Sequence, residues 1–318
     1  MSMSIQHLRG TAALRANGNG RASLLTIGFI GLGYMGSRIA RRLARPGFSV
    51  VAFDRNRRKA AELAPVGISP VSDPRDLAHN ADVILSCLSD DEAVRAVYDG
   101  PDGVIAHARP DALIVEMSTV RPETSRGLYR AGKKRGIDVL DVAISGSTPA
   151  AEQGALTLLS GGDRDVFDAA EPIFRAIAAQ WFYLGPSGSG TTMKLVVNAL
   201  LGVGMQAIAE AAAFGEKAGL ERDRMLEVLA QTKVVAPAHA GKIAQARANN
   251  YAPQFPLRHM NKDFKLILEE AATLQAPMPV TAAAQQKNMS EAAQGVEEDF
   301  SAVVRTMELL GAIRADRS

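Results

Sequence analysis

The sequence has a single cysteine, Cys87, which excludes an intramolecular disulfide. It also lacks an excess of either charge, because 36 basic residues stand against 34 acidic ones and leave a net charge of +2. Without a strongly basic face, neither nucleic acid nor a membrane surface is expected as a partner. A lone thiol agrees with a reducing compartment, and we expect a cytoplasmic location.

Long hydrophobic runs and clusters of metal ligands are missing as well. The longest apolar stretch, 195–209, contains Asn198, Gln206 and two glycines, and it is shorter than the roughly 20 residues that span a bilayer. The five histidines show no ligand spacing, so no metal site is expected. The 318 residues suffice for about two globular domains.

The first residues, 1–24, contain Arg9, Arg15 and Arg21 and no acidic residue. A mitochondrial-type targeting segment has this composition, and so does an unstructured extension. We interpret 1–24 as a flexible N-terminal extension and keep the targeting segment as the alternative.

The next part, 25–187, alternates between apolar runs typical of buried parallel strands and charged, periodic segments typical of helices. The runs predict strands at 24–30, 48–54, 81–88, 112–118, 137–144, 155–161 and 181–185. Strands that alternate with helices indicate an α/β fold with a doubly wound sheet and right-handed crossovers. We therefore predict a Rossmann-type dinucleotide-binding domain over 25–187.

The last part, 188–318, reads as helices throughout. The stretch 191–217 has no proline and few charged residues, which predicts one long helix that is buried on most sides. Later breaks are marked by prolines at 237, 253, 256, 277 and 279. We predict an all-helical domain for substrate binding and dimerisation, and we expect a homodimer or homotetramer because the long helix is nearly uncharged.

A glycine motif lies where the first predicted strand ends and a helix begins. Gly31 permits a tight turn, Gly33 lets a pyrophosphate approach the backbone, and Gly36 lets the helix pack on the strand. The free N–H groups at the start of the helix would then hold the phosphates. A dinucleotide is therefore expected to contact the loop residues Gly31, Leu32, Gly33, Tyr34 and Met35.

The choice of nicotinamide cofactor depends on the end of the second strand. Asp54 stands where a carboxylate would accept hydrogen bonds from the adenosine ribose and would repel a 2′-phosphate. Arg55, Arg57 and Arg58 follow directly, and arginines at this place can hold that phosphate. We expect NAD, contacted by Asp54 and Arg55, and leave NADP open.

Four segments in a fixed order carry a family resemblance. They are GFIGLGYMG (28–36), DVAISGSTPAAEQGALTLLSGG (141–162), GSGTTMKLVVN (188–198) and FPLRHMNKDFKL (255–266). Together they resemble the β-hydroxyacid dehydrogenases, which include 3-hydroxyisobutyrate dehydrogenases, 2-hydroxy-3-oxopropionate (tartronate semialdehyde) reductases and glyoxylate/succinic semialdehyde reductases. The resemblance extends over almost the whole chain after residue 24.

The resemblance implies roles for individual residues. Lys194 would be the catalytic residue, and Asn198 would contact the substrate one helical turn later. Ser145, Gly146 and Ser147 would hold the substrate carboxylate.

Further contacts are implied by the other matching segments. Ser118 and Thr119, with Leu88, would line the pocket beside the nicotinamide. Phe255 and Asp263 would lie near the substrate, and Lys262 near the cofactor.

This sequence also departs from related patterns. Ala143 replaces the proline usual in the substrate segment, so the identity of the substrate stays open. Val197 stands where the 6-phosphogluconate dehydrogenases have a histidine, and Lys194 is retained where the imine reductases have another residue.

The residues themselves support an acid–base role for Lys194. It lies near the positive end of the predicted helix and precedes three apolar residues, and both effects disfavour the ammonium form and lower its pKa toward neutrality. Asn198, four residues later, projects from the same face. The alternative is a lysine that merely extends from a buried helix to water.

The sequence therefore predicts an NAD(P)-dependent oxidoreductase that interconverts a short 3-hydroxy carboxylic acid and its semialdehyde, with Lys194 as general acid and base. A glyoxylate/succinic semialdehyde reductase and an imine reductase-like enzyme remain as alternatives. A third alternative is a non-catalytic scaffold that binds the cofactor.

Overall fold

The computed structural model describes residues 14–16, 22–45, 48–292 and 297–313. Contacts divide the chain into two compact units, Met1–Lys194 and Leu195–Ser318. This division falls inside helix α11 (Ser189–Lys217), whereas the boundary predicted from the sequence, 187/188, falls just before it. Within 1–24, strands β1 (Leu14–Ala16) and β2 (Ala22–Leu24) pair antiparallel, and the rest of the predicted flexible extension lies outside the described residues.

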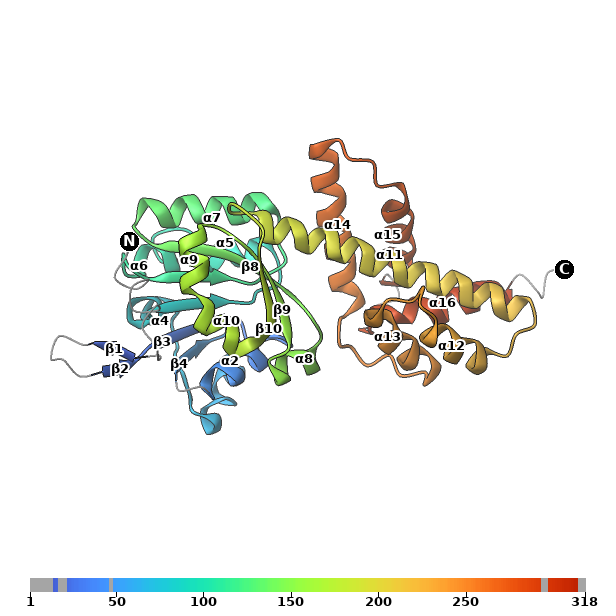
Figure 1. Cartoon of the computed structure of the whole chain (residues 1–318), viewed down its shortest axis with the longest axis horizontal. Helices are drawn as coiled ribbons and strands as arrows, with labels where there is room; N and C mark the ends of the chain where they lie inside the picture. The colour runs from blue at the N-terminus through green and yellow to red at the C-terminus, as the bar shows by residue number, and fades with distance from the viewer. Residues whose placement is uncertain (1–13, 17–21, 46–47, 293–296, 314–318) are drawn as a thin grey trace. The chain divides into compact units, whose positions relative to one another are not determined.

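The first unit is built around an eight-stranded sheet in the order β10-β9-β8-β7-β6-β3-β4-β5 (Figure 1). Its strands are β3 (Thr26–Ile30), β4 (Ser49–Phe53), β5 (Ile68–Pro70), β6 (Val83–Ser86), β7 (Leu113–Glu116), β8 (Asp138–Ser145), β9 (Leu156–Gly161) and β10 (Ala178–Tyr183). All seven strands predicted from apolar runs are present. Strand β5 was not predicted, because a three-residue edge strand that ends in proline leaves little pattern in the sequence.

The predicted parallel order fails at one place. Strands β8 and β9 pair antiparallel, so β9 and β10 run against the other six strands. The connection between them, 146–155, holds only the short helix α8 (Thr148–Gln153). A parallel crossover needs a dozen or more residues, so this connection is too short to return the chain to the other end of the sheet.

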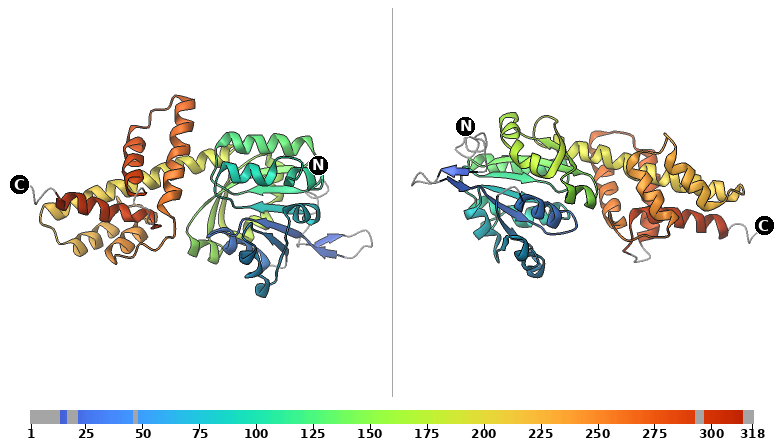
Figure 2. Two further views of the ribbon diagram at one scale, coloured as in Figure 1. Left: turned by 180° about the vertical axis from the view of Figure 1, so that it is seen from behind. Right: turned by 60° about the horizontal axis from the view of Figure 1, so that its bottom comes forward.

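Helices cover both faces of the sheet, as Figures 1 and 2 show. One face packs against α2 (Gly36–Ala44), α8, α9 (Arg164–Ala169) and α10 (Glu171–Ile177), and the other against α4 (Pro74–Asn80), α5 (Asp91–Tyr98), α6 (Val104–His107) and α7 (Pro122–Lys134). The remaining helix of this unit is the short α3 (Arg57–Ala61). Successive residues of β3 face opposite sides, with Phe29 in one core and Ile30 in the other. Because both faces are buried, the strands read as continuous apolar runs.

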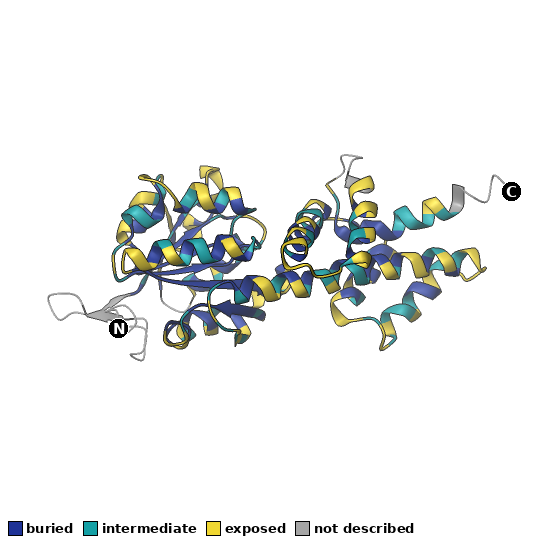
Figure 3. Ribbon diagram, turned by 90° about the horizontal axis from the view of Figure 1, so that it is seen from above, coloured by how far each residue is buried: buried dark blue, intermediate teal, exposed yellow. Residues whose placement is uncertain are grey.

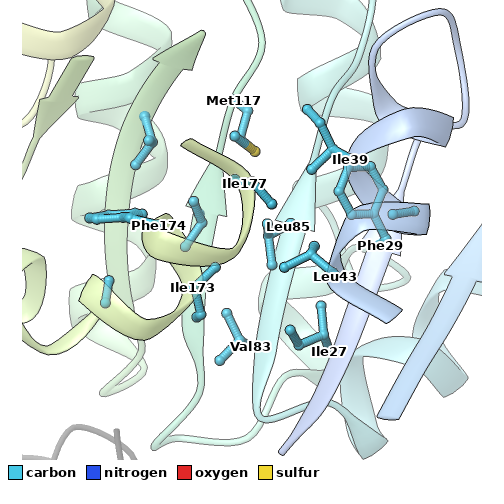
Figure 4. Close-up of a cluster of buried hydrophobic side chains, with 14 of the residues drawn as sticks. Ile27, Phe29, Ile39, Leu43, Val83, Leu85, Met117, Ile173, Phe174 and Ile177 are labelled. Atoms are coloured by element: carbon cyan, nitrogen blue, oxygen red, sulfur yellow. The ribbon is translucent and has the colours of Figure 1, made fainter. Parts of the chain in front are cut away.

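The core on the first of these faces fixes the start of α2. Figure 4 shows Ile39 and Leu43 of α2 and Phe174 of α10 among side chains from β3 and β6. All three are fully buried. Burying such side chains stabilises the fold by roughly 1.5–3 kcal/mol each. The position of α2 on the sheet, and with it the end of the glycine loop before α2, is therefore fixed.

The second unit consists of α11 beyond Lys194 and the helices that pack on it. They are α12 (Arg222–Gln231), α13 (Pro237–Arg247), α14 (Leu257–Leu274), α15 (Pro279–Ala292) and α16 (Val303–Ile313). Figure 3 shows buried and exposed residues alternating along these helices. The predicted α/β fold with a Rossmann-type domain and an all-helical second domain is therefore confirmed.

Helix α11 confirms the predicted long helix, with its start two residues earlier, but within this chain it is not buried on most sides, since Val196, Leu200 and Phe214 are 51%, 72% and 75% exposed. Within the described part of the chain, it alone is long and apolar enough to cross a membrane by length and composition. These properties are weak evidence for a membrane span, because the core helix of a globular protein shares them, and 44% of its most apolar window is buried.

A buried ion pair holds the segment before α14. Asp299, which is fully buried, accepts a hydrogen bond from Lys242 Nζ at 2.7 Å and from the backbone N–H of Phe255 at 2.9 Å. Burial lowers the pKa of Lys242, and the negative charge of Asp299 opposes that effect. The carboxylate thus fixes the chain where it enters α14.

We expect Asp299→Asn to lower the free energy of unfolding of the helical unit by about 3–5 kcal/mol, because the Lys242 ammonium stays buried without its counter-charge. Urea unfolding followed by circular dichroism measures the loss. Lys265→Ala breaks an exposed pair with Glu269 on α14 and should change the free energy by less than about 0.5 kcal/mol. Equal effects of the two substitutions would contradict a stabilising role for the buried pair.

Candidate active site

The turn between β3 and α2 requires glycine at two places. Gly31 has a φ of +91°, and a Cβ there would lie 2.4 Å from the carbonyl oxygen of Cys87. A Cβ on Gly36 would lie 2.0 Å from the carbonyl oxygen of Gly31. The start of α2 therefore rests directly on the turn, and no other residue type fits at either position.

Gly33 is a glycine for a different reason. A Cβ built on Gly33 would meet no protein atom within 4 Å, so packing inside the protein does not require a glycine here. No side chain caps the N-terminus of α2, and no acidic residue lies in its first turn. Open space above a bare backbone at a helix start fits a pyrophosphate, as the glycine motif predicts.

Asp54 lies at the end of β4 and is buried. Its Oδ2 accepts a hydrogen bond from the Leu32 N–H at 2.8 Å, and its Oδ1 accepts one from the Asn56 N–H at 2.8 Å. Lys59 Nζ lies 3.8 Å from Oδ2. One of about four acceptor positions of the carboxylate thus fixes the glycine loop, a second fixes the turn before α3, and two stay available for ribose hydroxyls.

The neighbouring arginines, unlike Asp54, face solvent. Arg55, Arg57 and Arg58 are all exposed. Arg57 and Arg58 open helix α3, where Asn56 caps the N-terminus by accepting from the Arg58 N–H at 3.2 Å. The structure therefore places a carboxylate and exposed guanidinium groups at the same strand end.

The sheet order reverses between β3 and β6, and the loops after β3, β6, β7 and β8 share one edge. Ligands of open α/β sheets bind in the crevice outside this edge at the reversal point. Leu88 donates its N–H to Ser118 Oγ at 2.7 Å, and Ser118 donates its own N–H to Glu116 Oε1 at 2.8 Å. The predicted contacts Leu88, Ser118 and Thr119 therefore come together beside the glycine loop.

The predicted carboxylate-binding stretch follows β8 at the same edge. Gly146 has a φ of +142°, and a Cβ on it would lie 2.9 Å from Leu156 Cδ2. Gly146 and Ser147 are exposed, and the Ser147 side chain makes no capping hydrogen bond to α8. Hydroxyl and N–H groups with these surroundings can bind an oxyanion.

The candidate catalytic residues lie on α11. Lys194 is in its second turn, and Asn198 follows one turn later. Asn198 is fully buried and donates through Nδ2 to Asp263 Oδ2 at 2.6 Å. Its Oδ1 has no hydrogen-bond partner among the described residues.

The segment around α14 supplies the remaining predicted residues. Asp263 is 1% exposed, and its Oδ1 lies 3.1 Å from Lys262 Nζ. Phe255 stacks on the His259 ring at 6.2 Å between centroids. Burial, together with the charges of Lys262 and Arg258, lowers the pKa of His259, which keeps this ring neutral at neutral pH.

Asp141 of β8 was not predicted as a site residue. Its carboxylate is buried and accepts hydrogen bonds from backbone N–H groups at the start of α11. One sign of Asp141 was present in the sequence, because it is a second aspartate, after Asp138, inside the apolar run 137–144. Among the described residues, no cluster of three or more potential ligands for a metal ion occurs.

Comparison with known proteins agrees with this geometry. Residues 26–185 match the family model described as "NAD binding domain of 6-phosphogluconate dehydrogenase". Residues 188–307 match the model described as "NAD-binding of NADP-dependent 3-hydroxyisobutyrate dehydrogenase". The protein is thus an NAD(P)-dependent dehydrogenase that acts on a hydroxyl group. It belongs to the family of hydroxyacid dehydrogenases that includes 3-hydroxyisobutyrate dehydrogenase, which confirms the resemblance found in the sequence.

Individual relatives show how far the likeness extends. The chain is 33% identical to glyoxylate/succinic semialdehyde reductase 1 of Arabidopsis thaliana, over 89% of this chain and 99% of that protein. A solved structure of Mycobacterium tuberculosis 3-hydroxyisobutyrate dehydrogenase with L-serine is 29% identical, with a TM-score of 0.82, and the match covers 90% of this chain and 99% of that one. The cytokine-like nuclear factor N-PAC of Anopheles gambiae is 36% identical over 83% of this chain, which spans 47% of that protein.

Alanine at the two loop glycines should have separable effects. We expect Gly33→Ala to keep the melting temperature and to weaken NADH binding at least about tenfold, ~1.4 kcal/mol, because the methyl group points into the space left for the pyrophosphate. Gly31→Ala should lower both the melting temperature and the affinity for NADH, because its Cβ meets the carbonyl oxygen of Cys87. NADH fluorescence titration and thermal unfolding measure the two quantities. Unchanged NADH binding by Gly33→Ala would exclude the loop as the pyrophosphate site.

Proposed function

We propose that the protein interconverts a short 3-hydroxy carboxylic acid and its semialdehyde, with Lys194 as general acid and base. The observation that carries the proposal is the polar pair Asn198–Asp263, which is fully buried inside the helical unit one turn beyond Lys194. Buried polar groups are rare unless they are satisfied or functional. Asn198 Oδ1 is an acceptor ready for a hydroxyl or ammonium proton.

The reaction needs a hydride acceptor and a proton acceptor. NAD(P)+, held by the glycine loop and Asp54, would supply the hydride acceptor for the hydroxyl-bearing carbon. The neutral Lys194 amine accepts the hydroxyl proton as the carbonyl forms, and in the reductive direction the ammonium returns it. Asp263 holds the Asn198 amide, which leaves Oδ1 to orient either the amine or the substrate hydroxyl.

The substrate carboxylate would bind to the stretch 145–147. Gly146 and Ser147 are exposed at the sheet edge, and Ser145 ends the strand that leads there. The neighbour solved with L-serine supports a 3-hydroxy acid, since serine carries its hydroxyl on the carbon next to the α-carbon. The likeness to a glyoxylate/succinic semialdehyde reductase supports that activity as the second candidate.

A steady-state panel tests the substrate class. It contains glyoxylate, succinic, tartronate and methylmalonate semialdehydes in reduction, and 3-hydroxyisobutyrate and L-serine in oxidation, each with both cofactors. Turnover of cyclic imines alone would select an imine reductase instead. The absence of any turnover together with normal NADH binding would select a cofactor-binding scaffold.

We further propose a homodimer or homotetramer. Val196, Leu200 and Phe214 on α11 are 51%, 72% and 75% exposed. Apolar side chains exposed along one helix are typical of an interface between subunits.

We expect Lys194→Ala to lower kcat by about 10²–10⁴-fold and to leave NADH affinity within a factor of about two, because it removes the proton donor and not a cofactor contact. Lys217→Ala, an exposed lysine at the other end of α11, is the matched control and should keep full activity. Full turnover by Lys194→Ala would show that another group moves the proton.

We expect Asp54→Asn to raise the ratio of kcat/KM for NADP over NAD at least about tenfold, ~1.4 kcal/mol. The substitution removes the charge that repels a 2′-phosphate and retains Arg55 beside it. Asp168→Asn on α9 makes the same change of charge at an exposed position and should leave the ratio unaltered. An unchanged ratio for Asp54→Asn would mean that Asp54 only fixes the loop.

A further inference from the structure

The first turn of α11 is fixed by one buried carboxylate. Asp141 Oδ1 accepts a hydrogen bond from the Gly188 N–H at 2.8 Å, and Oδ2 accepts one from the Thr191 N–H at 3.0 Å. Thr191 Oγ1 donates to the same Oδ2 at 3.3 Å. Helix N-termini leave N–H groups without intrahelical partners, and this carboxylate satisfies them from inside the sheet.

Glycines let this helix start touch the strands directly. A Cβ on Gly190 would lie 2.4 Å from the carbonyl oxygen of Leu159 and 2.7 Å from that of Asp141. A Cβ on Gly161 would lie 2.8 Å from the carbonyl oxygen of Pro186 and 2.9 Å from the Ser189 nitrogen. Backbone therefore meets backbone on both sides, and the helix start has no room to shift.

Helix α7 also contacts the first turn of α11. Ser125 Oγ and Thr191 Oγ1 lie 2.8 Å apart, and Ser187 Oγ donates to the carbonyl oxygen of Ser125 at 3.4 Å. Ser125 and Thr191 are both buried. The first turn of α11 is thus held by β8, β9 and α7 together.

Asp141 is linked to two residues of the proposed site, one through its own strand and one through its hydrogen bond to Thr191. Ser145 is four residues further along β8, about 13 Å away and on the same face of the strand. Lys194 is three residues after Thr191, so it lies about 4.5 Å further along the axis of α11. One carboxylate therefore connects the strand that ends at Ser145 to the first turn of α11, which directly precedes the turn that carries Lys194.

We infer that Asp141 is a positioning residue, which sets the Lys194 amine relative to the Ser145–Ser147 carboxylate site through the first turn of α11. The inference rests on the proposed function of these residues. Burial raises the pKa of Asp141, while the N–H groups of Gly188 and Thr191 oppose that shift. Burying this carboxylate costs solvation free energy. A role in holding the start of α11 in position explains why it is buried nonetheless.

The test is Asp141→Asn, with Asp138→Asn as its matched control. Asp138 lies at the start of the same strand, is also buried, and accepts a hydrogen bond from Lys133 of α7 at 2.9 Å. In Asp141→Asn the amide group cannot accept the N–H that the lost oxygen held. Thr191→Val is a milder second variant, which removes the hydroxyl contacts and keeps the backbone N–H bond.

We expect Asp141→Asn to lower kcat by roughly 10- to 100-fold while NADH affinity stays within about twofold, because small misplacements of a catalytic group have effects of this size. Thr191→Val should give a smaller loss of the same kind. Asp138→Asn should lower the melting temperature and keep kcat. Equal losses of kcat in Asp141→Asn and Asp138→Asn, or wild-type kcat in Asp141→Asn and Thr191→Val, would overturn the inference.

Hydrogen–deuterium exchange gives a readout that does not depend on turnover. Peptides that cover residues 186–194 should exchange faster in Asp141→Asn and at the wild-type rate in Asp138→Asn, since one of the two amides, Gly188 or Thr191, loses its acceptor oxygen. Unchanged exchange in Asp141→Asn would show that Asp141 does not hold the first turn of α11. If the wild-type protein turned over no hydroxy acid or semialdehyde, the proposed function would fail, whereas the exchange result would still decide whether Asp141 holds this turn.

Discussion

The structure depends on direct contact between backbone and backbone at the starts of two helices. Gly36 brings α2 onto the turn at Gly31, and Gly190 brings α11 onto β8 and β9. In both places a single methyl group would occupy space that a carbonyl oxygen already fills. Because interiors are packed at nearly crystalline density, contacts of this kind fix a helix more tightly than side chains of adjustable rotamer do. The cofactor loop and the lysine-bearing helix are both set in this way.

The two helix starts also share an electrostatic device. Asp54 accepts two backbone N–H groups beside the glycine loop, and Asp141 accepts two at the start of α11. Each carboxylate is buried and comes from a strand of the same sheet. A carboxylate that accepts hydrogen bonds from two N–H groups can hold together segments that are far apart in sequence without a covalent bond. The sheet thus supplies both the shape of the site and the groups that hold its loops.

Much of this could be predicted from residues alone. Apolar runs predicted the strands because both faces of the sheet are buried, and the glycine spacing predicted the cofactor loop because steric rules leave no other residue type at Gly31 and Gly36. The reversal of β9 was missed, although the shortness of 146–155 contained the information. Asp141 was missed because an aspartate inside a strand gives no sign of its acceptor role until α11 is in place. Asn198 and Asp263 were each named through the resemblance, but their hydrogen bond was not predicted, since 65 residues separate them.

The boundary between the two compact units has a consequence for how such a chain can change over time. It falls between Lys194 and Leu195, inside an unbroken helix and not in a linker. A recombination event at this point would leave Ser189–Lys194 as a stub, far shorter than the 12 or so residues that an isolated helix needs. A division of the chain at this point would therefore cost both parts the continuity of α11.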